Sequence, residues 1–253
     1  MMAPVTRDAV LALDFDGVIC DSRRECATVS WAGQHGWSPL DFDASTFRSI
    51  PEPFRRRFRE LRGYARSLGH FLVAVRSSGT ITSRRDFDAV YRTIPEREIA
   101  GFIGRVTDYR GQIRRNRPES WLALHQVYRG VRPLVETVAR SGYIVTARDV
   151  RSVVDLIGSF DVEIDPDRVF GDRTEKLGAL AAIATREEVE RDRVHLVDDS
   201  LDNVFDARGA GYGSSWAGWG YSTTEHRIQA RTMGVTPLSI EQAARRLDLG
   251  SRT

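Results

Sequence analysis

The sequence predicts an α/β fold, a doubly wound, Rossmann-like parallel sheet with an inserted helical segment. Short apolar segments with the length of buried strands alternate with segments of helical periodicity, which is typical of a parallel sheet covered on both faces. Between about residue 22 and residue 128 this alternation stops, and arginine-rich helical patterns follow one another without a strong strand. We therefore expect a core of residues 1–21 and 129–253 and a helical insert of residues 22–128.

The predicted strands are short apolar runs bounded by turn signals or by the start of a helical pattern. Three of them are strong, at residues 10–15, 143–146 and 194–197, and two are weaker, at 162–164 and 168–170. Helical spacing of apolar residues predicts helices at 131–141, 176–183 and 240–247. The ligand of such a sheet binds at the carboxyl ends of its strands, so the residues that follow each strand are the first candidates for a site.

The insert shows its clearest helical pattern over residues 53–68, where apolar and basic residues fall on different faces. The apolar face comprises Phe54, Phe58, Leu61, Ala65 and Leu68, and the basic face Arg55, Arg59, Arg62 and Arg66. We interpret the basic face as solvated. Attraction of an anionic substrate and binding of nucleic acid are the two alternatives.

Composition limits the classes of partner. The 253-residue chain has 37 basic and 35 acidic residues, so its net charge of +2 gives no reason to expect nucleic acid or a membrane surface as a partner. The two cysteines, Cys20 and Cys26, are not spaced as a C-x-x-C pair, and no histidine cluster accompanies them, so we expect neither a disulfide framework nor a zinc site. No signal peptide and no apolar stretch of membrane-spanning length is present. We therefore expect a cytoplasmic protein.

The strongest chemical signal is the pair Asp14 and Asp16, which lies at the end of the first strand and precedes Gly17. Two carboxylates so close repel one another unless a cation or a proton lies between them. A strand end with such a pair is typical of a divalent-metal site or of nucleophilic and acid–base chemistry. The alternative for a single pair is that the carboxylates cap a turn or a helix.

Three further polar elements lie at strand ends or open a helix. Thr146 ends the strand at 143–146, Lys176 opens a helix, and Asp198 and Asp199 follow the strand at 194–197. Each has a simpler interpretation by itself, as a helix cap or a solvated residue. Two later features also receive simpler interpretations: the glycines at 209–213 as a turn, and the tryptophans at 216 and 219 as packing residues.

In this order, the Asp14–Asp16 pair, Thr146, Lys176 and the Asp198–Asp199 pair resemble the four motifs of the haloacid dehalogenase superfamily. The resemblance covers residues 9–22 and about 130–225, and it is closest to phosphoglycolate-phosphatase-like members with a helical, C1-type cap. The insert occupies the position of that cap, which in the family closes over the substrate.

The resemblance implies roles for individual residues. Asp14 would be the nucleophile and Asp16 the general acid and base. Asp14, the backbone carbonyl of Asp16, and Asp199 would hold Mg²⁺. Thr146 and Lys176 would bind the phosphoryl group.

Further positions take supporting roles in this interpretation. Phe15, Gly17, Ala147 and Arg148 would bind phosphate, through backbone amides or, for Arg148, through the guanidinium. The alternative for Arg148 is that it pairs with Asp149 on the surface. The family usually has glycine where this chain has Asp198, and often a second acidic residue where it has Asn203. Asp198 is therefore an alternative metal ligand, and Asn203 a residue one step removed from the ion.

The implied function is Mg²⁺-dependent hydrolysis of a phosphomonoester through an aspartyl-phosphate, with a small organic phosphate such as a sugar phosphate as substrate. Asp16 argues against a dehalogenase, because a departing halide needs no proton whereas an alcohol does. A phosphotransferase or phosphomutase would use the same residues. The alternative from another class is a non-catalytic binding or regulatory protein on the same scaffold.

Overall fold

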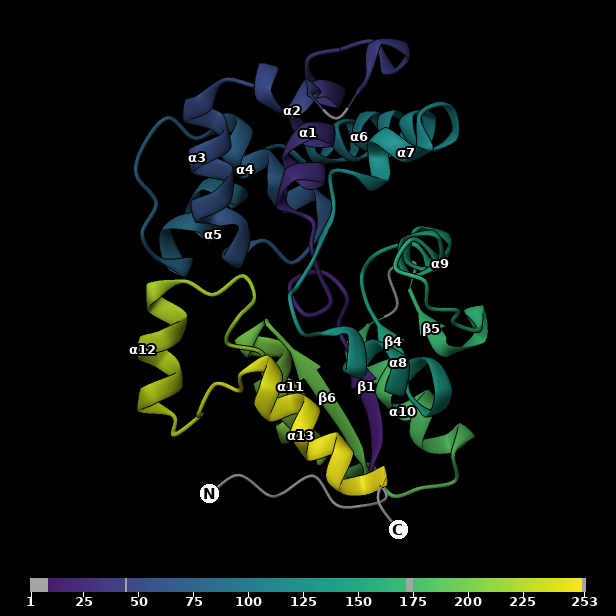
Figure 1. Cartoon of the computed structure of the whole chain (residues 1–253). Coiled ribbons are helices and arrows are strands. Elements are labelled where there is room, and N and C mark those ends of the chain that lie inside the picture. Colours follow the sequence, from purple (N-terminus) through teal and green to yellow (C-terminus); the bar gives the residue numbers. More distant parts are fainter. Residues whose placement is uncertain (1–8, 44, 172–174, 252–253) are drawn as a thin grey trace. The chain divides into compact units, whose positions relative to one another are not determined.

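The computed structural model describes residues 9–43, 45–171 and 175–251 of the chain. The chain divides into two compact units, which we call the sheet unit (Met1–Asp21 with Val127–Thr253) and the helical unit (Ser22–Gln126). Figure 1 shows the helical unit in purple to teal and the later part of the sheet unit in green to yellow. Among the described residues, no helix has both the length and the apolar character needed to cross a membrane.

The sheet unit is built on five parallel strands in the order β5-β4-β1-β6-β7. Their bounds are β1 Val10–Leu13, β4 Tyr143–Val145, β5 Val169–Phe170, β6 Val194–Asp198 and β7 Gly213–Trp216. The prediction of a doubly wound parallel sheet is confirmed. Strand β1 is central, and the chain places β4 and β5 on one side of it and β6 and β7 on the other. The strand order therefore reverses beside β1, which is where open α/β sheets bind ligands.

Six helices belong to the described part of the sheet unit: α8 Arg132–Ser141, α9 Val150–Gly158, α10 Lys176–Arg186, α11 Leu201–Gly209, α12 Thr224–Thr232 and α13 Ile240–Ser251. Helices α10 and α11 bury their apolar residues against one face of the sheet, in a cluster that includes Ala12 of β1 and Leu196 of β6. Helix α8 packs against β1, β4 and α13. Burial of these apolar surfaces is the main favourable term that holds the strand ends in place.

The helical unit contains α1 Arg23–Gln34, α2 Thr46–Ser49, α3 Glu52–Leu61, α4 Phe71–Arg76, α5 Arg84–Arg92, α6 Glu96–Asn116 and α7 Pro118–Leu122, with short 3₁₀ turns between them. Helix α1 packs along α6, where Gly33 lets the two backbones approach closely at Val106. The short strands β2 (Cys20–Asp21) and β3 (Gln126–Val127) pair with each other.

Two of the predicted elements are wrong. Residues 162–164 form no strand, because Asp161 turns the chain with a φ of 57° and the segment then runs into the 3₁₀ turn η4 (Pro166–Arg168). The helix expected over 53–68 ends at Leu61. Gly63 lies in a 3₁₀ turn there, and Ala65 is extended, so the apolar pattern continues across a break in the helix.

Strand β7 was not predicted, because its sequence lacks the β-branched and apolar residues that mark a buried strand. Its two serines are buried, and each hydroxyl is satisfied locally. Ser215 Oγ lies 2.8 Å from Nε2 of His195 on β6, and Ser214 donates to the carbonyl of Val204 on α11. Internal hydrogen bonds thus replace the apolar contacts that a strand in this position usually makes.

Candidate active site

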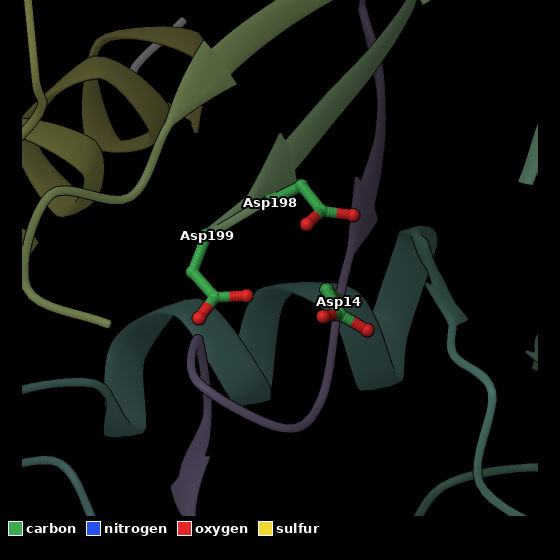
Figure 2. Close-up of side chains that lie close together, drawn as sticks. All are labelled: Asp14, Asp198 and Asp199. Atoms are coloured by element: carbon green, nitrogen blue, oxygen red, sulfur yellow. The ribbon is translucent and has the colours of Figure 1, made fainter. Parts of the chain in front are cut away.

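Strand register brings the candidate residues to one edge of the sheet. Leu13, the last residue of β1, pairs with Ile144 on β4 and with Val197 on β6. The residues that follow on each strand therefore lie side by side, and the backbone N–H of Asp14 donates to the carbonyl of Val197 at 2.9 Å. Figure 2 shows Asp14 at the end of β1, with Asp198 and Asp199 at the end of neighbouring β6.

Lys176 joins two of these carboxylates. Its Nζ lies 2.8 Å from Oδ1 of Asp14 and 2.8 Å from Oδ2 of Asp198, and it also donates to the carbonyl of Val145 at 2.6 Å. It is the first residue of α10 and its side chain is only 17% exposed. A buried ammonium with three oxygen partners partly neutralises a cluster of acids that would otherwise repel one another.

The electrostatics of this group are strongly perturbed. Burial raises the pKa of Asp14 to about 7, with Asp198 and Asp16 adding repulsion and Lys176 acting in the opposite direction. Burial by itself would lower the pKa of Lys176, but the carboxylates of Asp14 and Asp198 outweigh it and hold that pKa above its ordinary value. Lys176 is thus charged at every physiological pH, while Asp14 needs a further positive charge to be fully ionised at neutral pH.

Asp198 and Asp199 differ in how their carboxylates are bound. Asp198 accepts the backbone N–H of Ser200 on Oδ1 at 2.8 Å, and on Oδ2 it accepts Asn203 Nδ2 at 3.0 Å as well as Lys176. Asp199 accepts the backbone N–H of Tyr221 on Oδ2 at 2.7 Å. Both oxygens of Asp198 are therefore occupied by protein donors, and Asn203 lies next to Asp198 rather than to Asp14.

Gly17 lies directly against Asp199. Its φ is +94°, a conformation that side chains rarely adopt, and an added Cβ would lie closer than 3.0 Å to the carboxylate of Asp199. The loop after Asp14 and the metal-site candidate Asp199 therefore meet only because the residue between them has no side chain.

Asp16 is held by Arg148. The Nε and Nη2 atoms of Arg148 lie 3.1 and 3.0 Å from the two carboxylate oxygens of Asp16, in a bidentate pair. The side chain of Arg148 is 3% exposed and its guanidinium lies 5.8 Å from the ring centroid of Phe15. Such pairs are short, strong and geometrically specific. Arg148 therefore contacts the predicted general acid and is buried rather than located at the surface.

The remaining candidates lie at the end of β4 or within the loop after β1. Thr146 is 1% exposed, and its Oγ1 accepts the backbone N–H of Arg148 at 3.2 Å. Ala147 is exposed beside it. The side chain of Phe15 is fully buried, and its carbonyl accepts the N–H groups of the following turn. Only the backbone of Phe15 can therefore contact a ligand.

One segment that contacts the candidate site was not predicted from the sequence. Residues 216–221, which we call the aromatic segment, begin at the last residue of β7 and hydrogen-bond to both acidic loops through Trp216, Trp219 and Tyr221. The available signal was the glycine–aromatic pattern itself, which we interpreted as packing. Its partners are as many as 201 positions away in the chain, so the pattern gave no indication of what it contacts.

The donor set fits a divalent cation of the magnesium type. One carboxylate oxygen each from Asp14, Asp198 and Asp199 lies within 4.8 Å of the others, and all three residues are buried. Hard cations such as Mg²⁺ prefer oxygen ligands of this kind. A cation here would supply the positive charge that the perturbed Asp14 needs.

Solved structures of other proteins share this architecture. The chain resembles a haloacid dehalogenase-like family hydrolase from Streptococcus pneumoniae (14% identity, TM-score 0.55, covering 92% of this chain and 93% of that one). It also resembles a hydrolase from Pseudomonas syringae (12%, 0.58, 96% and 98%) and a predicted phosphoglycolate phosphatase from Haemophilus somnus (14%, 0.55, 87% and 89%). No family model and no curated protein matches the sequence.

The chain therefore has the haloacid dehalogenase-like fold. The likeness spans both units of the chain, because each of the three comparisons covers most of this chain as well as most of the other structure. At this level of identity it is the fold that is shared, and the chemistry has to be argued from the side chains.

Proposed function

We propose that this protein is a Mg²⁺-dependent phosphomonoester hydrolase that acts through an aspartyl-phosphate on Asp14. The observation that supports this most directly is Lys176, whose ammonium lies 2.8 Å from both Asp14 and Asp198 at the carboxyl edge of a haloacid dehalogenase-like sheet. A buried nucleophilic carboxylate with a fixed positive charge beside it suits attack on an anionic phosphorus centre.

The reaction has two steps. A carboxylate oxygen of Asp14 forms a bond to phosphorus while the ester P–O bond breaks, and the departing alcohol takes a proton from Asp16. Water then attacks the same phosphorus, the Asp14–phosphate bond breaks, and Asp16 accepts the proton of the water. Lys176 and the backbone amides near Thr146 stabilise the charge on the phosphoryl oxygens.

Asp14, the carbonyl of Asp16, and Asp199 would hold the ion, which when bound supplies charge that offsets repulsion between Asp14 and the phosphate. We assign Asp199 rather than Asp198 as the direct ligand because the carboxylate of Asp198 already has three partners, two hydrogen-bond donors and the ammonium of Lys176. Asn203 and Lys176 then fix Asp198 in the layer behind the ligands.

We propose a small organic phosphate as the substrate. The Haemophilus protein with this fold is described as a predicted phosphoglycolate phosphatase, so phosphoglycolate and sugar phosphates are the first compounds to test. The helical unit occupies the place of the family's cap in the chain, and we propose that it contributes the contacts that select the substrate.

The test is release of inorganic phosphate from a panel of small phosphate esters, with Mg²⁺ and with EDTA. We expect Mg²⁺-dependent turnover by the wild type and its loss in Asp14→Asn, because the amide is not a nucleophile. Asp155→Asn is the matched control, since Asp155 is an exposed carboxylate on α9 of the same unit.

Two results would contradict the proposal. Wild-type turnover by the Asp14→Asn variant would rule out an aspartyl-phosphate on Asp14. Transfer of the phosphoryl group to a second substrate without release of phosphate would identify a phosphotransferase that uses the same residues.

A further inference from the structure

The aromatic segment (residues 216–221) binds Asp199 at two points. The indole N–H of Trp216 donates to the backbone carbonyl of Asp199 at 2.9 Å, and the backbone N–H of Tyr221 donates to Oδ2 of Asp199 at 2.7 Å. Trp216 is 1% exposed. Backbone and carboxylate are thus held by the same short segment, which restricts both the position of Asp199 and the rotation of its side chain.

The same segment also binds the loop that follows Asp14. The indole N–H of Trp219 donates to the carbonyl of Val18 at 3.0 Å, and the hydroxyl of Tyr221 donates to the carbonyl of Cys20 at 3.3 Å. Val18 and Cys20 are fully buried, so their carbonyls depend on protein donors.

Gly220 makes this double attachment possible. A Cβ at this position would lie closer than 3.0 Å to the carbonyl oxygen of Gly17 and to the side chain of Asp199. The nearest of these atoms include backbone, which cannot turn aside as a flexible side chain can. Three separate parts of the chain therefore meet at Gly220 with no room for a side chain.

We infer that residues 216–221 form a positioning element for the metal site, which holds Asp199 and the Asp14 loop at the separation that Mg²⁺ coordination requires. The inference rests on the proposed function only in taking Mg²⁺ as the cation. Residues 216–221 include no charged side chain. The contribution of this element is to orient the ligands before the ion arrives, so its loss weakens metal binding without removing a ligand.

The test is Mg²⁺ affinity, measured by isothermal titration calorimetry on wild type, Gly220→Ala and Trp219→Phe. Trp219→Phe keeps an aromatic ring and removes the N–H that binds Val18, so it is the milder change. We expect Mg²⁺ binding to weaken by about 10- to 100-fold in Gly220→Ala and by a smaller factor in Trp219→Phe. Phosphate release at saturating Mg²⁺ should return toward the wild-type rate.

Gly209→Ala is the matched control, since an added Cβ at Gly209 meets no atom within 4 Å. Its Mg²⁺ affinity should equal that of the wild type, and circular dichroism should show that all variants are folded. Folded Gly220→Ala and Trp219→Phe proteins that bind Mg²⁺ as tightly as the wild type would overturn the inference and leave the proposed function intact. A wild type that binds no Mg²⁺ would instead overturn the metal dependence of the proposed function, and this inference with it.

Discussion

At the scale of single residues, the Asp16–Arg148 pair is the contact that most affects the proposed chemistry. A carboxylate that must donate a proton to a leaving alcohol and later accept one from water needs a fixed direction, and the bidentate guanidinium provides it. Arg148 therefore acts on the reaction through Asp16, and we predict that its replacement impairs the same step as replacement of Asp16.

The prediction is a dependence on the leaving group. Because Asp16 is also the base of the second step, the comparison is made on kcat/KM, which reports only the steps up to phosphoryl transfer to Asp14. Arg148→Met and Asp16→Asn should both lower kcat/KM for an alkyl phosphate, by about 10²- to 10⁴-fold for Asp16→Asn, which is the usual contribution of a general acid. Both should affect p-nitrophenyl phosphate much less, because nitrophenolate leaves without a proton. An equal loss for both esters in Arg148→Met, accompanied by a raised KM, would show instead that Arg148 binds the phosphoryl group.

The sequence could place the acids but could not show how they are bound. Asp14 and the Asp198–Asp199 pair each come at the end of a short apolar run that is typical of a buried strand, so their position at a sheet edge was predictable. The partner of Asp16 lies 132 positions away, and nothing in the local pattern around Arg148 distinguishes a buried guanidinium from a solvated one. Contacts of that range depend on the folded topology.

At the scale of elements, the packing of α1 on α6 contains a buried ion pair. Glu25 is fully buried, and Arg110 contacts its two oxygens at 2.6 and 3.1 Å, while the indole N–H of Trp121 lies 3.4 Å away. If the cation is removed, the buried carboxylate keeps its desolvation cost without the compensating attraction of the ion pair.

We predict that Arg110→Met destabilises the protein by about 3–5 kcal/mol, the typical effect of removing one partner from a buried pair. The double variant Glu25→Leu/Arg110→Met should recover much of this loss, because no uncompensated charge remains. Urea unfolding would measure both effects. A double variant as unstable as Arg110→Met would mean that packing of the arginine side chain, rather than the charge left behind, accounts for the loss.

The turn that leads into α4 carries a pH-dependent contribution to stability. Nδ1 of His70 accepts the backbone N–H of Arg66 at 3.0 Å, and its ring meets Phe87 and Tyr91 edge-on. Burial, with the nearby charge of Arg84, lowers the pKa of His70 to about 4. The folded protein therefore keeps this imidazole neutral at a pH where the unfolded chain has already protonated it.

The sign follows from linkage. Between pH of about 6.5 and about 4 the unfolded state binds more protons at His70, so stability falls as the pH falls through this window. His70→Asn, which retains a hydrogen-bond acceptor, should show a shallower loss of unfolding free energy from pH 7 to pH 4.5 than the wild type does. His35→Asn is the control at an exposed histidine. Parallel pH profiles for wild type and His70→Asn would contradict the prediction.

Elements were predictable where the local sequence determines them. The strands β1, β4 and β6 were located to within a residue or two because β1 and β4 are continuously apolar and the apolar run of β6 is interrupted only by His195. Strand β7 was not, since its serines are accommodated by hydrogen bonds to His195 and to the Val204 carbonyl. The overlong helix at 53–68 shows the opposite failure, because the amphipathic pattern continued past Gly63 while the helix did not.

At the scale of the whole molecule, the buried acids at the sheet edge, which the proposed reaction needs, lower the stability of the metal-free protein. Asp14, with its pKa raised to about 7, is less easily ionised in the folded protein than in the unfolded chain. Stability is therefore lost as the pH rises from about 4 to about 7, and the loss is complete above that range.

We predict that Asp14→Asn raises the melting temperature of the metal-free protein at pH 8 by several degrees, since about 1 kcal/mol corresponds to roughly 2–4 °C for a chain of this size. The advantage should shrink at pH 5. Mg²⁺ should raise the melting temperature of the wild type, because it binds the folded state, and should raise that of Asp14→Asn less. Differential scanning calorimetry with and without EDTA measures all three. A lower melting temperature for Asp14→Asn at pH 8 would show that its pairing with Lys176 outweighs the burial of its charge.

The central position of β1 has a consequence for the order in which the chain can assemble during synthesis. Strand β1 leaves the ribosome before the other four strands of its sheet, yet both of its neighbours in the sheet, β4 and β6, belong to the segment that begins at Val127. The whole of Ser22–Gln126 is therefore made while β1 has no partner, and the sheet cannot close on both sides of β1 until β6, ending at Asp198, has emerged. Contacts so distant in sequence form slowly. Nascent chains halted before residue 194 should accordingly expose β1 to proteases and chaperones, whereas the contiguous helical unit has all of its own residues by then.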